Sequence, residues 1–177
     1  QMIPYSRQQI TEEDIKVVAD ALRDDILTGG QKVSSFEEEL AKYIGVKHVI
    51  AMNSATSALH VAYLSLGVKE GDEVITTPIT FAATANAALM AGAQVKFCDV
   101  KMDGNIDEEK IPNLITPNTK VITAVDYGGN PVELDQIINL AKKHGIKVID
   151  DASHALGSVQ NGVKVGVKAD ISIFSFH

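Results

Sequence analysis

Short apolar segments alternate with helix-like segments along the whole chain, and this alternation most limits the folds it can adopt. The apolar segments have the length of strands, whereas the segments between them repeat apolar residues at helical spacing. Strands that are apolar throughout are typical of a parallel sheet with both faces covered. The sequence therefore predicts a three-layer α/β fold, in which helices flank a mostly parallel sheet on both sides.

The positions of these segments define the expected elements. Residues 1–10 are expected to form an extended arm, Thr11 to cap the first helix and Gly45 to end the second. Helices are expected at about 11–22, 34–44, 54–66, 80–92, 107–116 and 133–144. Strands are expected at 48–52, 73–76, 94–100, 120–125, 147–151 and 171–176. No low-complexity linker interrupts the series, so we expect no internal domain boundary.

Charge and cysteine content restrict the expected partners and the compartment. A net charge of −7 argues against general binding to nucleic acid or an anionic membrane, but it allows one local nucleotide site. The single cysteine, Cys98, permits no internal disulfide and lies in an apolar run, so we expect a core thiol and a cytoplasmic location. No apolar stretch reaches the roughly 18 residues of a transmembrane helix, and we expect no signal peptide.

Polar residues with possible ligand-binding roles follow three of the expected elements. They are the turn at 53–57, Asp151 with His154, and Ser175. In an open α/β sheet, ligands bind outside the carboxyl ends of the strands. A carboxylate such as Asp151 is costly to bury unless a protonated ring nitrogen, a metal or an arginine accompanies it. The alternative is that Asp150 and Asp151 only begin a turn.

The turn at 53–57 has the features of an anion site. It joins an expected strand to a helix, and the free N–H groups of a first helical turn attract a negative group. Ser54, Thr56 and Ser57 add hydroxyl groups, although the turn matches neither of the common glycine-rich phosphate loops. An ordinary Ser/Thr helix cap explains the same residues. Phe81, at the start of a later helix, either stacks on a ligand ring or belongs to the core.

One ligand with both a phosphate and a cationic ring would join these sites. Pyridoxal 5'-phosphate is such a ligand. A carboxylate beside its ring nitrogen favours the protonated ring, because an opposite charge stabilises the charged form. The protonated ring then acts as an electron sink for a carbanion.

Four segments resemble the sugar aminotransferases related to DegT, DnrJ, EryC1 and StrS, which are fold-type I enzymes that use pyridoxal phosphate. The segments are Asn53–His60, Thr76–Phe81, Asp150–Gly157 and Phe174–His177. Three more segments are similar to the branch that acts on UDP-linked 4-keto sugars in pseudaminic-acid biosynthesis. They are Leu27–Gly30, Phe81–Leu89 and Asp103–Asp107.

The resemblance implies a role for each matched residue. Asp151 would pair with the pyridinium nitrogen, and Asp150, where many relatives carry Glu, receives no catalytic role. His154, the catalytic candidate in this chain, would lie near the 3-hydroxyl group or the ring face. Phe81 would stack on the ring. The phosphate would be held by Ala55 through its N–H, Thr56 and Ser175, and the sugar nucleotide would lie near Tyr5, Leu27, Thr28 and Gly29.

The resemblance also implies that residues 1–177 are an N-terminal arm plus most of the cofactor-binding large domain. The small C-terminal domain and the Schiff-base lysine would follow His177, because Lys164 and Lys168 do not match the lysine position. A later antiparallel strand of the family would lie between the first and last strands of this chain. The intact protein is expected to be a homodimer.

The expected activity is transfer of an amino group from glutamate to the C4 keto group of a UDP-linked 4-keto-6-deoxy-N-acetyl-hexose. The chain of 177 residues alone is expected to be inactive, because it ends before the lysine. Two alternatives stay open: a sugar 3-dehydratase that uses the same cofactor, and a non-catalytic fragment that binds a phosphate or nucleotide. A metal site is a weaker option, since Asp150, Asp151 and His154 have no further ligands at a suitable spacing.

Overall fold

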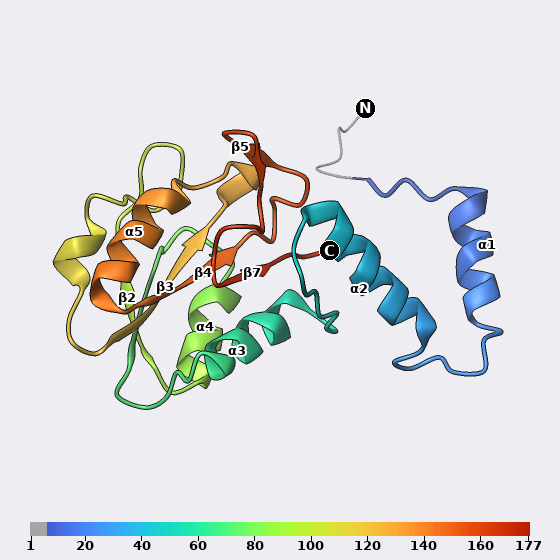
Figure 1. The fold of residues 1–177 in the computed structure, drawn as a ribbon, viewed down its shortest axis with the longest axis horizontal. Coiled ribbons are helices and arrows are strands. Elements are labelled where there is room, and N and C mark those ends of the chain that lie inside the picture. Colours follow the sequence, from blue (N-terminus) through green and yellow to red (C-terminus); the bar gives the residue numbers. More distant parts are fainter. Residues whose placement is uncertain (1–6) are drawn as a thin grey trace.

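A parallel sheet forms the centre of the computed structural model, which describes residues 7–177 (Figure 1). Its strand order is β2-β1-β3-β4-β7, and every neighbouring pair is parallel. The strands are β1 (Glu73–Thr76), β2 (Gln94–Phe97), β3 (Thr119–Val125), β4 (Lys147–Asp151) and β7 (Ile171–Ile173). This arrangement confirms the α/β fold with a mostly parallel sheet that the sequence predicts.

Helices cover both faces of the sheet, which explains why adjacent residues in the middle of its central strands are both apolar. On one face, α3 (Ala55–Ser65) and α4 (Ala83–Met90) form a core with alternate strand residues such as Val121 and Ile149. On the other, α5 (Leu134–His144) and the 3-10 turn η1 (Ile111–Leu114) pack against Ile122 and Val148. Because side chains alternate along a strand, successive residues of β4 face different helices.

The first two helices extend away from the sheet (Figure 1). Helix α1 (Glu12–Ala21) begins with the predicted cap: Thr11 Oγ1 accepts a hydrogen bond from Asp14 N at 3.2 Å. Helix α2 (Gln31–Ile44) ends at Gly45, whose φ of 92° is left-handed. The predicted start of α2 at the serines is wrong, because Gly30 serves as its N-cap in extended backbone. A Cβ at Gly30 would lie 2.5 Å from the carbonyl oxygen of Ile26.

Two other expected elements are wrong. Residues 48–52 form no strand in the described part of the chain, and Ile50 is 79% exposed. A strand needs a hydrogen-bonded neighbour, and no described strand lies beside this segment. The helix expected at 107–116 is reduced to η1. Asp107 instead accepts a hydrogen bond from Glu109 N at 3.2 Å, which favours a turn over a longer helix.

A short hairpin was not predicted. It consists of β5 (Val159–Gln160) and β6 (Val163–Lys164), which pair antiparallel. Asn161 and Gly162 connect them with φ angles of 51° and 77°. Asn-Gly is a strong signal for this tight turn, because both of its central residues need positive φ.

Candidate active site

The candidate residues gather at the edge of the sheet where the parallel strands end. Strand β4 ends at Asp151, and β7 ends just before Ser175. Helix α3 contacts β7, and Ala55 at its first position packs against the core that contains Ile173. The sheet edge therefore brings Asp151 and Ser175 onto the same side of the molecule as the N-terminus of α3.

Asp151 is buried, with 4% of its surface exposed, and its carboxylate is held from two sides. Thr84 of α4 donates its hydroxyl to Oδ2 at 2.6 Å. Ser153 donates its hydroxyl to Oδ1 at 2.6 Å and its N–H to the same oxygen at 3.3 Å. A carboxylate has about four acceptor sites, so these three bonds leave room for one more donor. The carboxylate is thus oriented but not saturated.

No cation accompanies the Asp151 carboxylate within residues 7–177, where the ion pairs involve other acids. A buried carboxylate without a cationic partner is energetically costly. A ligand that brings a positive charge to Asp151 would offset this cost. The bond from Ser153 N shows that Asp151 does begin a turn, but the bond from Thr84 reaches across to another element.

The N-terminus of α3 retains free donors. Ser54 caps the helix by accepting the N–H of Ser57 at 3.1 Å, and the two hydroxyls lie 3.0 Å apart. The cap interpretation is therefore correct for Ser54 and Ser57. It leaves the first two N–H groups, those of Ala55 and Thr56, without a helical partner. No acidic residue lies in this first turn, and Thr56 is exposed. The arrangement suits an anion.

Phe81 and His154 border the same edge. Phe81 is 73% exposed, so the interpretation of this residue as core is wrong. Its carbonyl accepts the N–H of Thr84, the residue that contacts Asp151, at 3.1 Å. His154 is exposed, and its Nδ1 accepts the N–H of Gly128 at 3.3 Å. The imidazole proton is therefore assigned to Nε2, which remains free to donate.

Asn105 holds the loop that contacts His154, a role that was not predicted. Its Oδ1 accepts the N–H of Tyr127 at 3.0 Å, and its Nδ2 donates to the carbonyl of Asn130 at 3.0 Å. Only 1% of Asn105 is exposed. Its Asp-Gly-Asn setting predicts a turn, but the loop that it contacts is distant in sequence, so no local pattern reveals the contact.

Replacing Asn105 with alanine is expected to lower the free energy of unfolding by about 1–3 kcal/mol, because the N–H of Tyr127 and the carbonyl of Asn130 both lose their partner, the buried Asn105 side chain. Denaturant unfolding of the intact protein would measure the loss. The matched control is Asn118→Ala, since Asn118 is exposed just before β3, at the opposite end of the sheet. Equal losses in the two variants would show that the Asn105 bonds contribute nothing specific.

The residues proposed for the substrate lie elsewhere. Leu27, Thr28 and Gly29 are exposed in the turn between α1 and α2, away from the sheet (Figure 1). A hollow of about 480 Å³ lined by Asp24, Ile26 and Lys32 lies beside this turn. Tyr5 lies outside the described residues. One chain therefore does not bring the turn at 27–29 to Asp151.

Other features restrict the chemistry of the described chain. Among residues 7–177, no three His, Cys, Asp or Glu side chains lie close enough to hold a metal ion. Burial and the nearby charge of Asp107 raise the pKa of the Cys98 thiol to about 11, which fits a core residue rather than a nucleophile. No helix in the same residues has the length and apolar character needed to cross a membrane.

Comparisons with known proteins agree with this geometry. Residues 8–177 match the DegT/DnrJ/EryC1/StrS aminotransferase family model. The chain is 61% identical to a UDP-4-amino-4,6-dideoxy-N-acetyl-beta-L-altrosamine transaminase of Campylobacter jejuni, over 99% of this chain and 47% of that protein. Helicobacter pylori PseC, described as an aminotransferase of pseudoaminic acid biosynthesis, superposes with a TM-score of 0.97 at 44% identity, over 100% of this chain and 48% of that one.

A second solved structure extends the likeness. The PLP-form of Spr1654 from Streptococcus pneumoniae, a putative sugar aminotransferase, superposes with a TM-score of 0.95 at 33% identity, over 99% of this chain and 49% of that one. The chain spans about half the length of the curated relatives it matches. Sequence, fold and the arrangement of the sheet edge agree: this chain belongs to the DegT/DnrJ/EryC1/StrS aminotransferase family.

Proposed function

We propose that the intact protein transfers an amino group from glutamate to the C4 keto group of a UDP-linked 4-keto-6-deoxy-N-acetyl-hexose, with pyridoxal phosphate as cofactor. Residues 1–177 would supply the N-terminal arm and most of the cofactor-binding large domain. The observation that carries the proposal is the buried Asp151 carboxylate, which lacks a cation at the same sheet edge where α3 offers free N–H groups. The named relatives support the class of substrate.

The donor set fits pyridoxal phosphate. Asp151 has one free acceptor site for a protonated ring nitrogen, and the Ala55 N–H, Thr56 and Ser175 offer donors for the phosphate. Exposed Phe81 provides a flat surface for the ring. The cofactor supplies a conjugated cationic ring that stabilises a carbanion.

The residues of the chain would hold this ring and keep its nitrogen protonated. The Asp151 carboxylate would stabilise a proton on the ring nitrogen, because an opposite charge favours the protonated form. Thr84 and Ser153 fix the carboxylate so that its free acceptor site does not rotate away. The N–H of Gly128 holds His154 through Nδ1, so that its Nε2–H would be available as a donor to the cofactor.

Tyr5, Leu27, Thr28 and Gly29 are proposed to contact the sugar nucleotide. The turn at 27–29 lies away from Asp151 in one chain, so this contact requires a second copy (Figure 1). A homodimer would supply it, with the turn of one subunit reaching the sheet edge of its partner.

The test uses the intact protein with pyridoxal phosphate, glutamate and the UDP-linked 4-keto sugar. We expect stoichiometric formation of 2-oxoglutarate and a 4-amino sugar, detected by mass spectrometry. A product that has lost its 3-hydroxyl group without gaining nitrogen would indicate a dehydratase instead. Binding of cofactor or inorganic phosphate without any turnover would support a non-catalytic protein and contradict the proposal.

A further inference from the structure

Four buried side-chain oxygen atoms have no hydrogen-bond partner in the described chain, and all four lie in one cluster. They are Asp126 Oδ2, both carboxylate oxygens of Asp150 and Ser172 Oγ. Asp150 pairs in register with Ser172 on β7 and with Ala124 on β3, two residues before Asp126. The three side chains form what we call the carboxylate cluster. It lies on the α5 face, opposite to Asp151.

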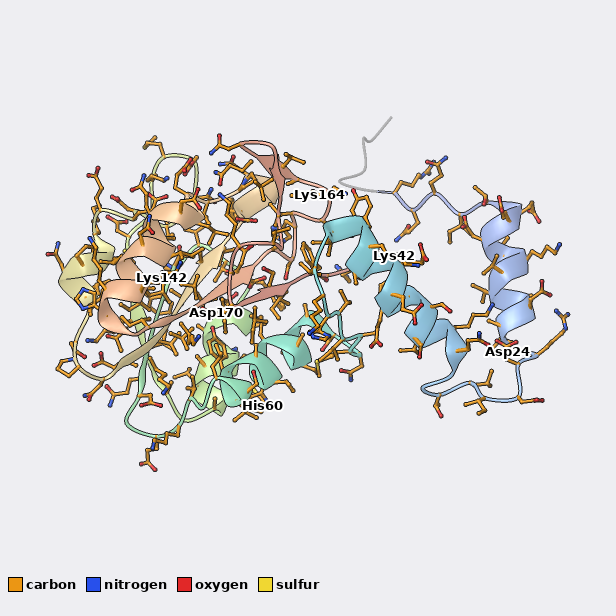
Figure 2. The ribbon with its side chains drawn as sticks, in the orientation of Figure 1. Asp24, Lys42, His60, Lys142, Lys164 and Asp170 are labelled. Carbon is orange, nitrogen blue, oxygen red and sulfur yellow. The ribbon has the colours of Figure 1, made fainter. Side chains whose placement is uncertain are left out.

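Among residues 7–177, no cation forms an ion pair with an acid of the carboxylate cluster. Asp150 is 0% exposed and Asp126 is 1% exposed. Lys164 and Lys168 line a cavity of about 10 Å³ beside Asp126, but both ammonium groups are engaged elsewhere. Lys164 donates to the carbonyl of Tyr43 and lies 3.9 Å from the centre of its ring (Figure 2). Lys168 pairs with Asp135 of α5 at 2.7 Å. The cavity has room for about one water molecule, which is too little for a hydrated ion.

One added proton would give this cluster a donor that its two carboxylates lack. A protonated Asp150 has an O–H to share with Asp126, its neighbour on the same face of the sheet, and the Ser172 hydroxyl is a second donor in the cluster. Asp126 Oδ1 already accepts the N–H of Val132 at 2.9 Å. We propose that Asp150 is neutral in the folded protein at neutral pH and that its proton links Asp126, Asp150 and Ser172. The cluster then buries one negative charge instead of two, which removes most of the repulsion between adjacent carboxylates.

The electrostatics of the two acids support this assignment. Burial and then the charges of Asp126 and Asp151 raise the pKa of Asp150 well above its ordinary value. Burial and the charge of Asp151 also raise the pKa of Asp126, to about 6. Asp126 accepts the N–H of Val132, which favours its charged form, whereas Asp150 accepts no hydrogen bond from the described residues and is the acid that keeps its proton.

The proton has a consequence for the residue on the other face of β4. If Asp150 is neutral, Asp151 is the charged member of the Asp150-Asp151 pair, and its charge is directed toward the sheet edge. The proton is a property of the folded chain and does not depend on the reaction that the protein catalyses.

Stability as a function of pH tests the proton in the intact protein. A raised pKa in the folded state means that folding takes up a proton, so the stability falls as pH rises above the unfolded pKa of about 4. Asparagine mimics neutral aspartic acid and does not titrate. At neutral pH the equilibrium constant for unfolding is expected to be lower for Asp150→Asn than for the wild type. The ratio of the wild-type constant to the variant constant is expected to shrink about tenfold per pH unit toward pH 4.

Asp99→Asn is the control, because Asp99 is an exposed acid whose pKa is lowered by its hydrogen bond to Lys110. This variant should show a small effect of opposite sign. Infrared spectroscopy adds a direct measurement: the band of a buried protonated carboxyl group should be present in the wild type at neutral pH and missing from Asp150→Asn. The proposal is overturned if this band is absent from the wild type. It is also overturned if Asp150→Asn is less stable than the wild type at neutral pH but not at about pH 4.

Discussion

Replacement of Asp151 by asparagine is expected to lower kcat for amino-group transfer by about tenfold to thousandfold. An opposite charge at close range shifts a pKa by about 1–3 units, so removing it lowers the protonated fraction of the ring nitrogen by the same factors of ten. The amide has nearly the shape of the carboxylate, and its oxygen still accepts the hydroxyl of Thr84 or Ser153. The loss should therefore come from charge, with the fold preserved.

The matched control for this variant is Asp170→Asn. Asp170 pairs with Lys147 at 2.7 Å and precedes β7, at the opposite end of the sheet from Asp151 (Figure 2). Steady-state kinetics with glutamate and the UDP-linked keto sugar should show wild-type kcat for Asp170→Asn. Full activity of Asp151→Asn, or an equal loss of kcat in both variants, would show that the charge of Asp151 does not contribute specifically to the reaction.

Gly129→Ala is expected to disturb His154 more than the neighbouring change Gly128→Ala. Both glycines have positive φ, at 83° and 62°, so both variants incur the roughly 1–2 kcal/mol cost of a left-handed residue. A Cβ at Gly129 would lie 2.9 Å from the carbonyl oxygen of His154, whereas nothing lies within 4 Å of one at Gly128. The second variant adds no such close approach and retains the N–H that donates to His154 Nδ1, so the difference between the two variants measures the contact at Gly129.

We expect Gly129→Ala to weaken cofactor binding at least tenfold more than Gly128→Ala, because the His154 backbone must move to admit the methyl group; the difference corresponds to about 1.4 kcal/mol. Titration of each variant of the intact protein with pyridoxal phosphate measures this. If the two variants bind pyridoxal phosphate with equal affinity, the position of His154 does not contribute to cofactor binding.

The sheet was predictable because burial on both faces leaves a direct pattern in the sequence. Strands β1, β3 and β4 each contain adjacent apolar residues that face the two helical layers, and they closely match their expected ranges. Residues 48–52 have a similar pattern but form no strand, because pairing depends on a neighbour and not on local composition alone. The start of α2 was missed because the serines resemble caps, whereas backbone geometry makes Gly30 the cap.

The position of Asp151 was predictable because parallel strands end at one edge of the sheet. The residues that support it were not. Thr84 lies in an alanine-rich helix that shows no sign of a polar contact, yet its hydroxyl is 2.6 Å from the Asp151 carboxylate. Asn105 likewise binds backbone groups of Tyr127 and Asn130, which are distant in sequence. Such contacts depend on how elements pack, which local periodicity does not encode.

The central claim is that the Asp151 carboxylate holds a proton on the ring nitrogen of pyridoxal phosphate. The most direct test is nitrogen NMR of the intact protein loaded with cofactor labelled with ¹⁵N at that position. The account predicts the chemical shift of a protonated pyridinium in the wild type at neutral pH, and the shift of a neutral pyridine in Asp151→Asn. An unprotonated ring nitrogen in the wild type, or the same protonated shift in both proteins, would contradict it.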